Sequence, residues 1–319
     1  MNSIELCAGA GGQALGLERS GFDHRALIEI DAHACDTLRL NRPNWNVIEG
    51  DLTHFGARHY RGIDLVAGGV PCPPFSKAGK QLGAADERDM FPQAIRVVDE
   101  TRPQAVMLEN VRGLMDPKFA DYRQNVSKQL KALGYWSDWH LFNAADFGVC
   151  QLRPRVVCVA LRQGIAPYFQ WPELSAKKPP TVGELLLDLM TERGWRGAQA
   201  WHHLANDIAP TLVGGSKKHG GPDLGPTRAR AAWAKLQVDG RGLANEAPDP
   251  DFDAMPRLTV RMCARIQGFP DDWVFAGKKT ASYRQVGNAF PPPVAHMVSA
   301  QIASAIEQAS AHRQMKKAA

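Results

Sequence analysis

The first 160 residues alternate short apolar runs with longer segments of helical periodicity. Apolar runs typical of buried strands occur at Ser3–Leu6, Ala26–Glu29, Leu65–Ala67, Ala105–Leu108 and Val156–Leu161. Between them lie amphipathic segments such as Ala32–Asn41 and Phe91–Thr101. Strands and helices that alternate at this spacing predict an α/β fold built on a parallel, doubly wound sheet.

The character of the chain changes after about residue 165. Residues 166–256 are rich in Pro, Gly, Trp and His and have few periodic segments. A capping box of Thr181 and Glu184 predicts one short helix there, Val182–Met190. Residues 166–256 are therefore predicted to form a smaller, irregular domain that follows the first one.

Helical periodicity returns at Arg257. Thr259 is expected to cap a helix that ends at Gly268. One face of a C-terminal helix is marked by Val294, Val298, Ile302 and Ile306. Because no strand accompanies that helix, it should pack back onto the first domain. The predicted division is thus 1–165, 166–256 and 257–319.

Composition narrows the class of protein. With 44% hydrophobic and 22% charged residues and a mean hydropathy of −0.31, the chain has the composition of a soluble globular protein. No apolar run is long enough for a membrane span, and the N-terminus lacks the basic leader and apolar core of a signal peptide. We therefore expect a cytoplasmic protein with no membrane association.

The cysteine spacing and the net charge give weaker indications of function than the composition does. Six cysteines are scattered without a C-x-x-C pair, and no H-E-x-x-H helix occurs, so neither a zinc cluster nor any other metal site is predicted. The net charge of +5 is compatible with a polyanionic partner.

A glycine-rich turn follows the first predicted strand. Residues 9–14 fit G-x-G-x-x-[G/A], which lets the backbone approach a ligand at a helix N-terminus. Glu29 ends the next strand, where a carboxylate can bind two ribose hydroxyls, and Asp51 could accept a bond from an adenine amino group. These residues favour an adenosine-containing cofactor. They fit a nicotinamide dehydrogenase equally well, and the glycines alone fit a plain tight turn.

A cysteine between prolines follows the strand at Leu65–Ala67. Cys72 lies in Gly-Gly-Val-Pro-Cys-Pro-Pro-Phe-Ser, residues 68–76, just past the carboxyl end of that strand. Ligands bind at such strand ends in open parallel sheets, and prolines stiffen a loop. A single loop cysteine is usually inert, but this position is also suited to a nucleophile.

Six motifs in order resemble those of the cytosine-C5 DNA methyltransferase family, of the single-chain bacterial or phage type, over almost the whole chain. The motifs are ELCAGAGG, GGVPCPPFS, Glu109-Asn110-Val111, Gln151-Leu152-Arg153-Pro154-Arg155, residues 257–270 (RLTVRMCARIQGFP) and residues 284–295 (RQVGNAFPPPVA). The resemblance implies a Rossmann-like fold that binds S-adenosyl-L-methionine, with a target-recognition domain at 166–256. Three positions depart from the family pattern: Cys7 replaces a usual Phe, Glu5 a common Asp, and Val70 the first Pro of P-P-C.

The resemblance also implies roles for individual residues. The implied cofactor contacts are Cys7, Ala8, Gly9, Gly11, Gly12, Glu29, Ile30, Asp51, Leu52, Pro71, Asn288 and Ala289. Cys72 would attack ring position 6 of cytosine as a thiolate. Glu109 would protonate or hydrogen-bond ring nitrogen 3, and Arg155 would hold the exocyclic oxygen. Arg153 could orient Glu109 or bind a phosphate, and Glu109 and Arg155 could also form a merely structural salt bridge.

The expected partner is double-stranded DNA, from which the target cytosine must be flipped out. The implied DNA contacts are Ser76, Lys77, Lys80 and Arg88 in a basic loop, and Arg193, Arg196, Lys217, Lys218, Arg228 and Arg230 in the recognition domain. A separately encoded cognate restriction endonuclease is a possible further partner, and a monomer on DNA is expected. Two alternatives remain open: a tRNA methyltransferase of the same family, although its usual C-F-T triplet is absent from the sequence, and a catalytically inactive DNA-binding relative.

Overall fold

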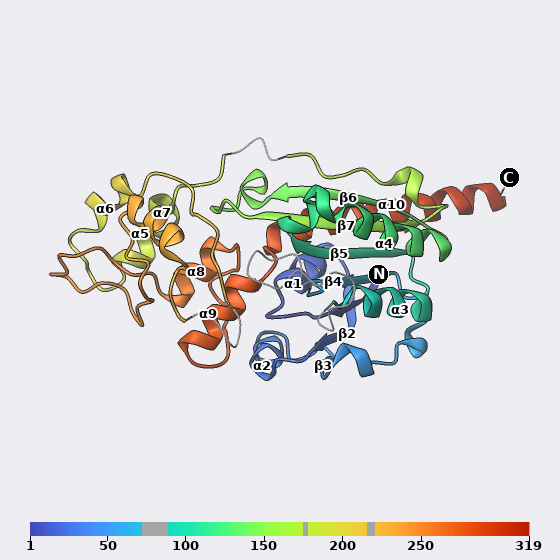
Figure 1. Cartoon of the computed structure of the whole chain (residues 1–319), viewed down its shortest axis with the longest axis horizontal. Helices are drawn as coiled ribbons and strands as arrows, with labels where there is room; N and C mark the ends of the chain where they lie inside the picture. Colours follow the sequence, from blue (N-terminus) through green and yellow to red (C-terminus); the bar gives the residue numbers. More distant parts are fainter. Residues whose placement is uncertain (72–88, 175–177, 216–220, 319) are drawn as a thin grey trace.

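The computed structural model describes residues 1–71, 89–174, 178–215 and 221–318. At its centre lies a seven-stranded sheet with the order β3-β2-β1-β4-β5-β7-β6 (Figure 1). The strands are β1 Asn2–Leu6, β2 Asp23–Glu29, β3 Val47–Glu49, β4 Leu65–Gly68, β5 Ala105–Val111, β6 Tyr135–Asn143 and β7 Pro154–Arg162. β1 to β5 are all parallel, and the strand order reverses between β1 and β4. The predicted α/β class is confirmed.

The sheet is mixed rather than wholly parallel, which corrects one expectation. β7, predicted to continue the parallel series, runs antiparallel to both β5 and β6. The connection from β6 to β7, residues 144–153, holds only a 3-10 turn at Ala144–Phe147. A parallel crossover needs a dozen or more residues, so this short connection forces an antiparallel pair.

Helices cover both faces of the sheet. One face carries α1 Gly12–Arg19, α2 Ala32–Asn41 and α10 Pro292–Ala318, and the other carries α3 Phe91–Thr101 and α4 Ala120–Ala132. The alternation of strand side chains accounts for this: Leu65 and Ala67 pack with Val298 of α10, while Val66 between them packs with Val98 of α3. The core of the first domain is therefore two apolar layers separated by the sheet.

The C-terminal helix returns to the first domain as predicted. Val294, Val298, Ile302 and Ile306 are all buried, and they belong to the same apolar cluster as strand residues of β4 and β7. α10 lies so close to α1 that a Cβ at Gly16 would stand 2.5 Å from the Ala295 Cβ. Only glycine permits that approach, so Gly16 fixes how the last helix docks.

A second body holds α5 Val182–Thr191, α6 Ala198–Leu204, α7 Thr227–Lys235, α8 Val260–Ile266 and α9 Lys279–Asn288 (Figure 1). The predicted capping box at Thr181 and the cap at Thr259 are both present. Trp201 and Trp233 share one buried cluster with Met262 of α8 and Val286 of α9. The first part of the stretch 257–319 thus packs with residues 182–247, and only α10 lies on the sheet.

Short 3-10 turns complete the described chain: η1 Leu52–His54, η2 Arg58–Tyr60, η5 Arg112–Met115, η6 Pro117–Phe119, η7 Ala144–Phe147 and η8 Ala166–Tyr168. Among the described residues, no helix combines the length and apolar character that a bilayer crossing requires.

Candidate active site

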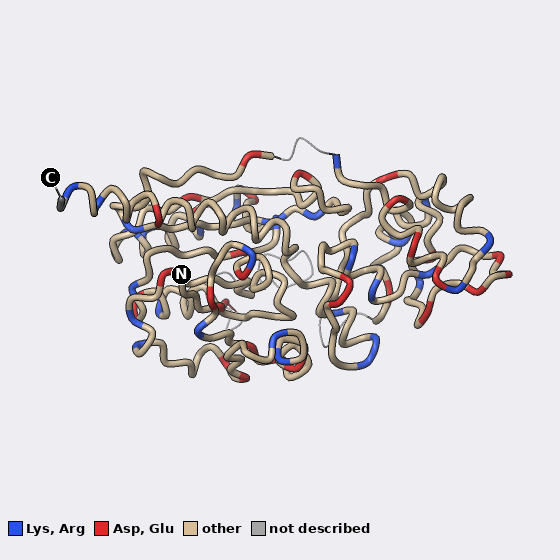
Figure 2. Tube along the Cα trace, turned by 180° about the vertical axis from the view of Figure 1, so that it is seen from behind, with Lys and Arg blue, Asp and Glu red and all other residues tan. Residues whose placement is uncertain are grey.

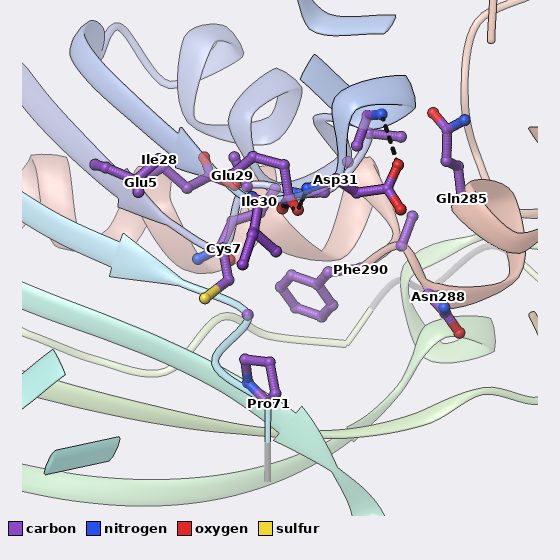
Figure 3. A pocket seen from close by; sticks show the side chains of 18 of the residues that line it. Glu5, Cys7, Ile28, Glu29, Ile30, Asp31, Pro71, Gln285, Asn288 and Phe290 are labelled. Carbon is purple, nitrogen blue, oxygen red and sulfur yellow. Dashed lines mark hydrogen bonds between the residues drawn. The ribbon is translucent and has the colours of Figure 1, made fainter. Parts of the chain in front are cut away.

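A cavity of about 610 Å³ opens at the carboxyl ends of β1, β2, β4 and β5 (Figure 3). Most of the predicted cofactor contacts line it: Cys7, Ala8, Gly9, Gly12, Glu29, Ile30, Asp51, Leu52, Pro71, Asn288 and Ala289. The first-domain strands supply one wall, and α9 together with the two residues that follow it supplies the opposite one. The cavity lies where the sheet order reverses, the usual ligand position in an open α/β sheet.

Gly11 is the one predicted cofactor residue that is not part of the cavity wall. Its φ of 84° is left-handed, and a Cβ there would stand 2.7 Å from Leu38 Cδ2 and 2.9 Å from Trp273 Cζ2. Gly11 therefore allows the turn to pass beneath neighbouring side chains and does not itself face the cavity.

The Glu29 carboxylate is fixed by backbone donors. Its Oε2 accepts from Gly9 N at 2.7 Å, and its Oε1 accepts from Ile30 N at 2.9 Å and Asp31 N at 2.8 Å. Three backbone donors hold this carboxylate in one orientation. Asp51 accepts from Thr53 N at 2.8 Å, and that backbone bond lowers the pKa of the Asp51 carboxyl. The cavity thus presents two oriented carboxylates to hydroxyl or amino groups.

Sequence reasoning missed several cavity residues. Glu5, Arg284, Gln285 and Phe290 also line the wall. The Glu5 side chain is buried, and burial raises the pKa of its carboxyl well above the usual range. Arg284 of α9 pairs with Asp31 at 3.3 Å, joining α9 to the start of α2. Arg284, Gln285 and Phe290 all belong to the motif at residues 284–290 (RQVGNAF), and this motif is the sequence feature from which they could have been predicted.

A buried ion pair adjoins the cavity. Arg155 Nε lies 2.8 Å from Glu109 Oε1, and both side chains are about nine-tenths buried. The register of β5 and β7 places Val157 opposite Glu109 and Arg155 opposite Val111, so Glu109 and Arg155 lie diagonally on one face. The antiparallel course of β7 therefore creates this contact.

Glu109 also lines the cavity. Burial raises the pKa of its carboxyl, and the Arg155 guanidinium opposes that rise. A Cβ on Gly69 would lie 3.3 Å from Glu109 Oε2, so the chain leading to Cys72 passes directly beside this carboxyl. A buried carboxyl with a raised pKa is suited to donating a proton.

The start of the cysteine loop is tied to β5. Asn110 Nδ2 donates to Val70 O at 2.8 Å, and Met90 N donates to Pro71 O at 3.2 Å. Figure 3 shows the Cys7 sulfur directed toward the segment that leads to Pro71. Several predicted residues lie outside the described residues: Cys72, Ser76, Lys77, Lys80, Arg88, Lys217 and Lys218.

Arg153 is fully buried. Its guanidinium donates to Leu212 O at 2.8 Å, Gly287 O at 2.7 Å and Ala289 O at 3.0 Å. These are backbone carbonyls of residue 212 in the second body, of the last turn of α9 and of the residue that follows that helix. A fully buried guanidinium held in this way is out of reach of a DNA phosphate.

The predicted DNA-binding arginines of the recognition domain fall into two groups. Arg193 pairs with Asp249 at 2.6 Å and with Glu246, and Arg196 pairs with Asp251. Figure 2 shows charges of both signs interspersed at this far end of the molecule. On α7, Arg228 and Arg230 have no ion pair with any described carboxylate, and Arg230 donates to Thr227 Oγ1 at 3.4 Å.

No cluster of metal-ligating side chains occurs within the described ranges. The site is thus a cavity with two oriented carboxylates, next to a buried acid and its arginine.

Comparisons with known proteins agree with this geometry. The family model for C-5 cytosine-specific DNA methylase matches residues 1–304. Type II methyltransferase M.NgoMIV of Neisseria gonorrhoeae is 59% identical over 96% of this chain and 98% of its own length. M.NaeI of Lentzea aerocolonigenes is 56% identical over 95% of this chain and 75% of its own length.

Among solved structures, a prophage-encoded Escherichia coli protein described as a DNA modification methyltransferase superposes with a TM-score of 0.68. It is 24% identical, covers 96% of this chain and 99% of its own, and supports the fold alone. The match over residues 1–304 excludes the dehydrogenase alternative. The chain belongs to the C-5 cytosine-specific DNA methylase family.

Proposed function

We propose that this DNA (cytosine-5-)-methyltransferase transfers a methyl group from S-adenosyl-L-methionine to carbon 5 of a flipped-out cytosine, through a covalent adduct with Cys72. The observation that carries the proposal is the position of Glu109, which lines the cofactor cavity and bonds to Arg155 at the same time. One carboxyl thus borders both the methyl-donor site and the side from which a base would enter.

The cavity fits an adenosine-containing cofactor. The Glu29 carboxylate, held by three backbone N–H groups, is oriented to accept bonds from two ribose hydroxyls. Asp51 can accept from the adenine amino group, and the N-terminus of α1 adds partial positive charge for a carboxylate. S-adenosyl-L-methionine, when bound there, supplies an electrophilic methyl group.

Each proposed catalytic residue either adds electron density to the cytosine ring or stabilises the negative charge that results. The Cys72 thiolate adds to position 6, which breaks aromaticity and places electron density on carbon 5. Protonated Glu109 donates to ring nitrogen 3, and Arg155 stabilises the exocyclic oxygen. After carbon 5 is methylated, a base removes its proton and the thiolate leaves as the double bond re-forms.

In this proposal the DNA contacts both bodies. A duplex buries both reacting carbons, so the base must be flipped. Ser76, Lys77, Lys80 and Arg88 would hold phosphates beside the flipped base, and Lys217, Lys218, Arg228 and Arg230 would contact DNA from the recognition domain. The enzyme would act as a cytoplasmic monomer and protect DNA from a separate restriction endonuclease.

Cys72 can be tested by trapping. Duplex DNA containing 5-fluorocytosine, together with S-adenosyl-L-methionine, is expected to give a denaturation-resistant adduct, because fluorine cannot be removed as a proton. Cys72→Ala should form none on a denaturing gel. The buried Cys150 offers a matched control, and Cys150→Ala should still be trapped. An adduct in Cys72→Ala would overturn the nucleophile assignment.

Glu109→Gln removes the proton donor while preserving the shape of the side chain. We expect the single-turnover rate to fall by about 10²–10⁴-fold, with the affinity for S-adenosyl-L-homocysteine unchanged within a few-fold. Glu100 is the matched control. It pairs with Arg96 at 2.9 Å and does not line the cavity, so Glu100→Gln should turn over normally. Normal turnover of Glu109→Gln would show that another group stabilises the charged ring.

The two groups of recognition-domain arginines should respond differently. Arg228→Gln is expected to weaken duplex binding and to reduce the slope of log K against log salt by about 0.9, the effect of one lost phosphate contact. Arg193→Gln should leave the slope unchanged because Arg193 is already paired with Asp249. Fluorescence anisotropy across a salt series measures both, and equal slope changes would contradict the distinction.

We also infer that the target sequence is shared with M.NgoMIV and M.NaeI. The matches to both relatives cover at least 95% of this chain, so they include residues 166–256, where DNA specificity would be determined. Bisulfite sequencing of DNA from cells that express this chain or M.NgoMIV should show the same modified cytosine in the same sequence context. Two different contexts would refute a shared target.

A further inference from the structure

The Q-L-R part of the segment 151–155 contacts the recognition domain with all three residues. Gln151 Oε1 accepts from Leu212 N at 2.9 Å, and Arg153 donates to Leu212 O at 2.8 Å. Between them, Leu152 N donates to Ala209 O at 2.8 Å, and Leu152 O accepts from Thr211 Oγ1 at 2.5 Å. Both polar groups of the Leu212 backbone are therefore held by side chains of the catalytic domain.

The same two side chains hold the C-terminal end of α9 and the residue that follows it. Arg153 donates to Gly287 O and Ala289 O. Gln151 Nε2 donates to Gln267 Oε1 at 2.6 Å, and Gln267 donates in turn to Ala289 O. Ala289 and its neighbour Asn288 line the cofactor cavity. Gln151 and Arg153 thus connect the recognition segment to the cavity wall.

Residues 209–215, the recognition segment, are held from the other side by α9. A Cβ on Gly287 would stand 2.3 Å from Gly214 N, so the two backbones are in direct contact. Asn288 Nδ2 donates to Gly215 O at 3.3 Å. The recognition segment is therefore fixed between α9 and residues 151–153, which directly precede β7. Arg153 is two residues from Arg155 in the chain.

A fully buried guanidinium that bonds only neutral acceptors is expensive to desolvate. Arg153 makes no ion pair with any described carboxylate, and its Nε has no partner among the described residues. If stability alone were needed, an apolar side chain of similar volume would serve as well. The arrangement is explained by geometry, since one rigid planar group can fix carbonyls from two separate segments.

We propose that Gln151 and Arg153 are positioning residues that align the recognition segment with the Glu109–Arg155 pair and the cofactor cavity, so that target discrimination depends on them. This rests on the proposed function for its enzymatic readout. The recognition segment would present the target sequence in a fixed register to the reacting groups. Arg153 would therefore contribute to choosing the cytosine, and not to the chemistry performed on it.

The variants Arg153→Lys and Gln151→Met retain bulk but lose most of these bonds. For each we expect about tenfold weaker discrimination, measured as kcat/KM on the target duplex relative to a duplex with one changed base pair. KM for DNA should rise, while the single-turnover rate at saturating target DNA should stay within a few-fold. Amide hydrogen exchange of peptides covering 209–215 should become faster.

Arg162 provides the matched control. Arg162 is partly buried, and it too bonds backbone carbonyls: it donates to Pro103 O at 3.1 Å and Leu133 O at 3.3 Å, away from the recognition segment. Arg162→Lys should change neither discrimination nor exchange at 209–215.

Three outcomes would overturn the proposal. One is unchanged exchange at 209–215 in both variants, and another is unchanged discrimination. The third is a large loss of single-turnover rate with discrimination intact, which would make Arg153 a catalytic residue. If the wild-type chain methylated no cytosine, the proposed function would fail, whereas the exchange experiment would still test the contact.

Discussion

The buried contact between Arg155 and Glu109 is the constraint around which the site is arranged. A carboxyl and a guanidinium this deeply buried are stable only when they face each other closely, and the 2.8 Å contact requires β7 to lie beside β5 in one register. That register requires β7 to run antiparallel. The antiparallel strand β7 is thus needed for the site, because it brings Arg155 next to Glu109 near the carboxyl end of β5.

The second requirement is close backbone approach, which the sequence meets with glycine. Gly16 lets α10 dock on α1, and Gly287 lets the recognition segment contact α9. The first contact brings the end of the chain back to the first domain, and the second joins α9 to residues 209–215. The cavity is completed by this return, since Arg284, Asn288 and Phe290 face residues contributed by β1 and β2.

The sequence predicted what depends on local pattern. The strands with continuous apolar character, the caps at Thr181 and Thr259 and the buried face of α10 all follow from spacing within a few residues. β6 escaped prediction because Tyr135–Asn143 is an edge strand, half exposed, whose polar and aromatic residues do not alternate cleanly. The direction of β7 was predicted wrongly, because an apolar strand pattern is the same in either direction. Only the short connection from β6 indicates the antiparallel course.

Site residues show the same division. Glu29, Asp51 and Glu109 could be selected because each lies at or near the carboxyl end of a strand, and these ends meet at one edge of the sheet. The pairing of Arg193 and Arg196 with the acidic residues Glu246, Asp249 and Asp251 could not be foreseen, because those carboxylates lie more than fifty residues away in the chain. Arg153 was among the predicted site residues, but its carbonyl partners at Leu212, Gly287 and Ala289 become visible only in three dimensions.

These contacts join two bodies that have separate cores. The second body has its own buried tryptophans, and the sheet has its own two apolar layers. Apolar packing alone allows small slips between such bodies, since it is not directional. Hydrogen bonds from Gln151 and Arg153 to the Leu212 backbone are directional, and they fix the distance from the recognition segment to Arg155. A polar contact placed between two apolar cores thus supplies a fixed register between the two bodies that apolar packing alone would not give.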